Sequence, residues 1–112
     1  MLLRLSHRRS QRALLRIPIS VSWKPPVGPA NLKVAAETEV VGAHGALIRL
    51  QQAPEQNARV EITHGHTRQT APGRVIAVEP PGKENEPYRV TVELSVPSET
   101  FWGLSLPPLH PA

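Results

Sequence analysis

The stretch YRVTVELSV, residues 88–96, decides the fold class because its side chains alternate with a period of two. Every second residue from Tyr88 to Val96 is aromatic or aliphatic, and the residues between them are polar. Successive side chains of a strand point to opposite faces. One face of this segment therefore faces a core and the other faces water, which is typical of an antiparallel sheet.

Five further segments carry strand patterns. In RIPISVSW the residues Ile17, Ile19, Val21 and Trp23 share one face. The breaks between segments are rich in turn residues, as in KPPVGP (24–29) and PPGKENEP (80–87). Short strands at regular spacing predict a barrel or sandwich, and strands with one polar face favour a closed six-stranded antiparallel β-barrel. We expect the other strands at about 31–41, 46–50, 58–64 and 73–79.

The barrel is expected to span residues 16–106, between a basic arm at 1–15 and a proline-rich tail at 107–112. Near its end, SETFWG (98–103) predicts one short helical turn with Ser98 as the N-cap. Thirteen prolines in 112 residues argue against long helices.

The charge is concentrated in the arm. Five arginines and no acid fall in the first 16 residues, whereas the remaining chain holds eight basic and nine acidic residues, all nine of them glutamate. A near-neutral body with a basic arm indicates an anionic partner that touches the arm. No run approaches the 18 apolar residues of a membrane span, and the chain has no cysteine for a disulfide or a thiolate.

Catalytic chemistry finds little support in the sequence. The serines lie in no motif with a histidine, and no aspartate is present to orient one. His64 and His66 share one face of a strand, but a metal ion needs a third and a fourth ligand. We therefore predict no catalytic residue, no metal site and no cofactor, and we predict that the protein is not an enzyme.

Arginines of the arm recur every four residues, at Arg8, Arg12 and Arg16, with Arg9 beside them. This spacing lines one side of the segment whether it is helical or extended. A guanidinium suits phosphate oxygens and also the O6 and N7 atoms of guanine. The alternative is an arm that simply attracts polyanions.

The arm arginines and the turn GAHG (42–45), which is followed by the apolar run ALI (46–48), together resemble the motifs of the PilZ domain family. RALLRIPI (12–19) looks like the family's arginine pair before its first strand, in the register Arg12 and Arg16; Arg8 and Arg12 remain a second register. TEVVGAHGALI (38–48) resembles the family's second motif, T-x-D/N-x-S-x-x-G-A-x-I, with Gly45 as its final glycine. The ending FWG (101–103) is also similar.

The resemblance implies a six-stranded barrel and a cyclic di-GMP site. It implies that Arg12 and Arg16 take the ligand, helped by Arg8 and Arg9, opposite a turn with Gly42 and Gly45. To these candidate ligand-binding residues we add His44 of the same turn, whose imidazole we expect at the rim of the site. Two positions depart from the family pattern. Val40 stands in place of the acid or amide, and Gly42 in place of the serine, so we expect weakened binding.

The leading functional expectation is a non-catalytic, cytoplasmic bacterial signalling module that binds cyclic di-GMP and then shows an altered surface to an unidentified effector protein. The alternative is a degenerate PilZ barrel that binds no nucleotide and acts through protein–protein contacts. A nucleic-acid-binding barrel is a third reading. The sequence disfavours nucleic acid because its few aromatic residues fall at core or C-terminal positions rather than on a stacking platform.

Overall fold

The computed structural model describes residues 12–28, 30–98 and 100–103, which form seven β-strands. Six of these strands confirm those predicted from the pattern of the sequence. The seventh, β1, lies within the segment expected to be an arm. The strands are β1 (Arg12–Leu14), β2 (Pro18–Trp23), β3 (Leu32–Gly42), β4 (Gly45–Leu50), β5 (Arg59–His64), β6 (Thr70–Glu79) and β7 (Tyr88–Leu94).

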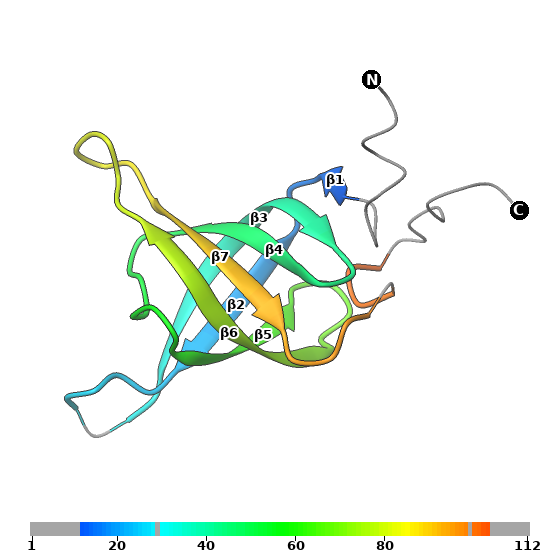
Figure 1. Ribbon diagram of the computed structural model, residues 1–112, viewed down its shortest axis with the longest axis horizontal. Helices are drawn as coiled ribbons and strands as arrows, with labels where there is room; N and C mark the ends of the chain where they lie inside the picture. The colour runs from blue at the N-terminus through cyan, green and yellow to red at the C-terminus, as the bar shows by residue number, and fades with distance from the viewer. Residues whose placement is uncertain (1–11, 29, 99, 104–112) are drawn as a thin grey trace, which may run out of the picture.

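Six of the strands close into an antiparallel barrel (Figure 1). The order around the barrel is β3-β2-β5-β6-β7-β4, and a pairing between β3 and β4 joins the two ends. All pairings are antiparallel. Closure leaves these six strands without an open sheet edge. The predicted fold class is thereby confirmed.

The barrel interior is filled by the residues that the period-two pattern places inward. On β7, Val90, Val92 and Leu94 are all buried, as predicted. Fully burying one such side chain contributes roughly 1.5–3 kcal/mol to folding. The expectation for Val96 is wrong, because the ladder with β6 ends at Leu94 and Val96 is 70% exposed.

β1 extends the barrel wall along β3 on the side where β2 also pairs. Arg12 lies opposite Gly42 and Leu14 opposite Val40, while β2 pairs with the first half of β3. β1 and β2 thus run along the same side of β3, separated by a break at residues 15–17. Thr38 fills that break: its hydroxyl accepts a bond from the Ile17 N–H at 2.8 Å and donates to the Leu15 carbonyl at 2.5 Å.

The segment after β7 closes the end of the barrel at which the β3–β4 turn lies (Figure 1). The side chains of Phe101 and Trp102 are buried there. The Ser98 hydroxyl accepts the Phe101 N–H at 3.1 Å, which is the capping contact that the sequence predicts. The segment forms a turn, however, and the described residues contain no helix. Accordingly, no helix long and apolar enough to cross a membrane occurs in this part of the chain.

Candidate functional site

A groove of about 580 Å³ opens on the outside of the barrel beside β1, and we call it the arm groove. Its walls come from β1, β3, β4, β6 and β7, together with the β3–β4 turn. Four of the residues predicted from the sequence line it, although they come from two separate parts of the chain: Arg12, Gly42, His44 and Gly45.

Arg12 reaches the groove because β1 pairs with the last residues of β3. Exposure alternates along the segment: Arg12, Leu14 and Arg16 are exposed, and the residues between them are half-buried. The guanidiniums of Arg12 and Arg16 therefore leave the same side of an extended segment, one of the two geometries considered for the arm. Arg8 and Arg9 lie outside the described residues.

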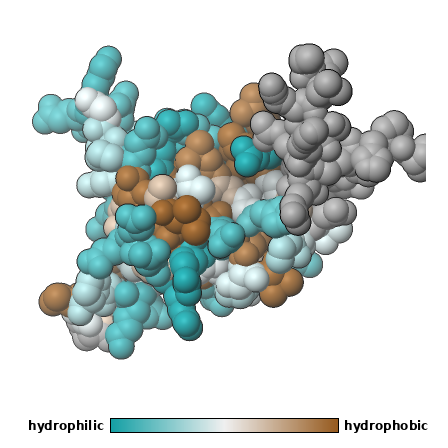
Figure 2. Space-filling model, in the orientation of Figure 1, coloured by the Kyte–Doolittle hydropathy of each residue, from teal (hydrophilic) through white to brown (hydrophobic). Residues whose placement is uncertain are grey.

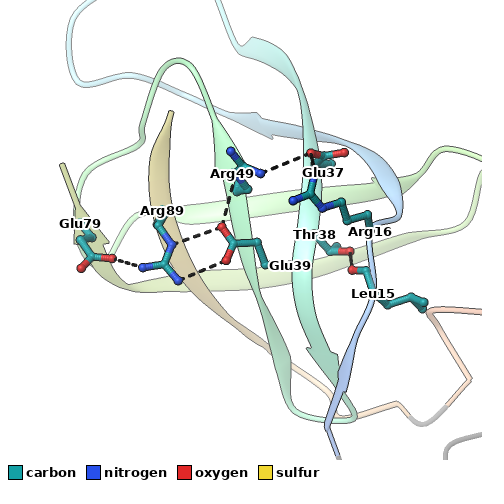
Figure 3. A network of polar contacts seen from close by, with 8 residues as sticks. All are labelled: Leu15, Arg16, Glu37, Thr38, Glu39, Arg49, Glu79 and Arg89. Atoms are coloured by element: carbon teal, nitrogen blue, oxygen red, sulfur yellow. Dashed lines mark hydrogen bonds and ion pairs between the residues drawn. The ribbon is translucent and has the colours of Figure 1, made fainter. Parts of the chain in front are cut away.

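Arg16 does not line the arm groove but joins a network of ion pairs on the outside of the barrel (Figure 3). Its Nη1 lies 3.5 Å from Oε1 of Glu37, and Arg49 contacts both Glu37 and Glu39. These pairs are partly exposed, so each contributes about 0–1 kcal/mol. An anionic ligand at Arg16 would have to compete with Glu37.

The network continues from β4 to β7 through Arg89, which bonds to Glu39 at 3.1 Å and to Glu79 at 2.8 Å (Figure 3). The hydrogen bond and charge of Glu39, followed by the charge of Glu79, raise the pKa of Arg89 above its ordinary value. The three glutamates are thus already partnered by arginines.

Gly45 has a packing role at the start of β4. A Cβ atom at this position would overlap the carbonyl oxygen of Val92 on β7, because Gly45 pairs directly with Glu93 there. Only glycine permits this approach of the two strands. The glycine that matches the family motif is therefore explained by barrel closure without any ligand.

The carbonyls of the β3–β4 turn are held by the chain that follows β7. The Gly42 carbonyl accepts the Trp102 indole N–H at 2.9 Å, and the Ala43 carbonyl accepts the Ser98 N–H at 2.8 Å. The His44 carbonyl accepts the Leu94 N–H, also at 2.8 Å. His44 itself is exposed on the turn, as expected, and it lines the groove.

A row of apolar side chains lies on the outside of the barrel at the groove. The sequence analysis did not predict this row as part of the site. Val40 and Leu47 pair with each other across β3 and β4 and are half-buried. Leu14, opposite Val40, is 86% exposed, and Ile76 on β6 is 41% exposed. Figure 2 shows apolar atoms at the surface among polar ones over the strands in front, β4, β7 and β6. The sequence does contain one indication of this apolar surface, because the alternation of the strand places the side chain of Leu47 on the outside of the barrel.

His64 is buried, and both ring nitrogens have partners. Its Nδ1 accepts the N–H groups of His66 and Thr67 at 3.0 and 3.2 Å, so Nε2 carries the proton and donates to the Trp102 carbonyl at 3.2 Å. No cluster of three metal-ligating side chains occurs within the described ranges. In the structure His64 connects β5 to the C-terminal turn.

No protein-family model matches this chain, and no curated protein matches it significantly. The likeness to a family therefore rests on the motif residues themselves, and the fold is established by the strand pairings. The chain is a small domain built around a closed six-stranded antiparallel β-barrel.

Proposed function

We propose that the protein is a non-catalytic bacterial signalling module of the PilZ type, which acts in the cytoplasm and binds cyclic di-GMP at the arm groove. One observation carries the proposal. The β1–β3 pairing brings Arg12 opposite Gly42, into the groove that His44 and Gly45 also line. These residues are the ones that the resemblance selects, and they lie about 30 positions apart along the chain.

The arginines supply the ligand's phosphate and guanine contacts. A guanidinium forms two parallel hydrogen bonds to a phosphate or to the O6 and N7 edge of guanine. Arg12 already lies in the groove, and Arg16 leaves the same side of the segment. Displacing Glu37 from Arg16 costs little, because an exposed ion pair contributes about 0–1 kcal/mol.

The groove also explains why binding is expected to be weak. Val40 offers no polar atom from its side chain and Gly42 has none, so two groups of the ligand lose their partners. Each unsatisfied group costs about 1–3 kcal/mol. In addition, Glu93 lines the groove, and its negative charge repels phosphate.

A second candidate is a barrel that binds no nucleotide and acts by contact with an effector protein. The observation that favours it is the apolar surface formed by Leu14, Val40, Leu47 and Ile76. A half-apolar outer face beside arginines and glutamates that already pair with each other suits a protein surface better than a dianion.

Calorimetric titration with cyclic di-GMP at about 0.15 M salt separates the two candidates. The proposal predicts saturable binding with a Kd below about 100 μM, abolished in the double variant Arg12→Ala/Arg16→Ala. The matched control, Lys33→Ala/Arg59→Ala, removes the same charge from exposed positions outside the groove and leaves binding intact.

Two results would overturn the nucleotide proposal. Absence of heat at about 100 μM ligand leaves the protein-contact candidate. Equal loss in both double variants, with a steep salt dependence and similar binding to any polyanion, indicates unspecific attraction to nucleic acid and other polyanions.

A further inference from the structure

The C-terminal turn contacts the arm groove from behind. Gly42 lines the groove, and its carbonyl accepts the Trp102 indole N–H at 2.9 Å. The next carbonyl, of Ala43, accepts the Ser98 N–H at 2.8 Å. The backbone that walls the groove is therefore held in place by the segment that follows β7, which we call the C-terminal clamp (Ser98, Phe101 and Trp102).

The clamp is itself rigidly anchored. Trp102 is 1% exposed, and its ring meets the Phe101 ring edge-on with centroids 4.9 Å apart. The Trp102 carbonyl accepts a bond from Nε2 of His64, whose other ring nitrogen is engaged by two backbone N–H groups. Protein interiors packed in this way have few voids, so a displacement of the Gly42 backbone also moves the Trp102 indole.

We infer that Trp102 is a positioning residue for the arm groove: its indole N–H fixes the β3–β4 turn, and occupation of the groove strengthens that hydrogen bond. The second half of this inference rests on the proposed function, whereas the first half concerns the ligand-free protein. Coupling between two sites is reciprocal, so disengaging the clamp also weakens ligand binding. In this way the clamp transmits groove occupancy to His64 on β5, which bonds to the Trp102 carbonyl.

Trp23 provides an internal control for the measurement. It pairs with Leu32 at the opposite end of β3 from Gly42, about 30 Å away at strand spacing. The two tryptophans of the chain give two indole N–H signals in a ¹H–¹⁵N spectrum. We expect the Trp102 signal to report on the groove and the Trp23 signal to be insensitive to it.

The first test needs no ligand. In the variant Trp102→Phe, the indole donor is lost but an aromatic ring remains. We expect the Ser98 and Leu94 amide protons, which bond to the turn, to exchange about 2- to 10-fold faster with solvent. The Asn57 amide, which bonds to the Val75 carbonyl and not to the β3–β4 turn, keeps its exchange rate. Unchanged exchange at Ser98 and Leu94 in a folded variant would overturn the positioning role.

The second test adds cyclic di-GMP to the full chain. We expect the Trp102 indole signal to move with saturation while the Trp23 signal stays, and Trp102→Phe to bind more weakly than Trp23→Phe. If the ligand binds and the Trp102 signal does not move, the second half of the inference, the coupling to groove occupation, is wrong and the proposed function stands. If no ligand binds, the proposed function fails, and the ligand-free exchange rates alone decide the positioning role.

Discussion

At Gly45 a single missing side chain decides how closely two strands approach. Any Cβ atom there would meet the carbonyl oxygen of Val92, which belongs to the backbone and has no free rotation. A glycine in a motif is easily interpreted as a ligand contact, since glycines let ligands approach a backbone. In this protein the first requirement on Gly45 comes from the β4–β7 ladder.

Gly45→Ala is therefore expected to destabilise the fold. Forcing the Cβ against the Val92 carbonyl should lower the free energy of unfolding by about 1–3 kcal/mol or more, measured by urea denaturation. Gly82→Ala is the matched control, because its Cβ would lie 3.4 Å from the flexible Glu86 carboxylate in an exposed loop. Equal stability of the two variants would contradict the packing role.

At the scale of elements, the break between β1 and β2 determines where the arm goes. The Thr38 hydroxyl satisfies one N–H and one carbonyl of the break, and the Thr38 N–H in turn donates to the Ile17 carbonyl at 3.1 Å. β3 has a register irregularity between Thr38 and Val40 at the same place. Beyond the break, the Leu15 N–H donates to the Glu39 carbonyl, and β1 continues along β3 toward the groove.

Thr38→Val tests this junction, because valine keeps the shape of threonine and removes the hydroxyl. Two backbone groups lose their partner, so the free energy of unfolding should fall by about 1–3 kcal/mol. The Leu15 amide should also exchange faster with solvent as β1 loosens. Thr63→Val, at a half-buried position on β5, serves as the control; a similar loss in both variants would show that the junction is not special.

Over the whole molecule, the strands could be predicted from the sequence and the site only in part. The alternation of residues 88–94 follows directly from burial on one face, and the structure shows the same alternation of buried and exposed residues. The structure extends β6 back to Thr70, whereas the sequence predicts its start at about residue 73. Pro72 lies among the added residues. It is tolerated because pairing with β7 begins at Gly73, and the Pro72 carbonyl still accepts the Ser95 N–H.

Contacts between segments that are distant in the sequence could not be predicted from the alternation of side chains or the spacing of motifs. That β1 pairs with β3, and so brings Arg12 to Gly42, depends on the junction at Thr38. Likewise, nothing in the spacing of FWG shows that the Trp102 indole bonds to Gly42. The pairing of Arg16 with Glu37 is also a product of the folded strands.

The most direct test of the account as a whole is calorimetric titration of the variant Val40→Asn with cyclic di-GMP, beside the unaltered chain. Val40 lies on the groove wall, half-buried and outside the core cluster, so an amide fits there without disturbing the barrel. If the arm groove is the ligand site, restoring one polar partner should tighten binding by about 5- to 150-fold. Leu47→Asn, on the neighbouring strand directly opposite Val40, should give no such gain. Affinity that stays unchanged or falls in a folded Val40→Asn variant would contradict the account.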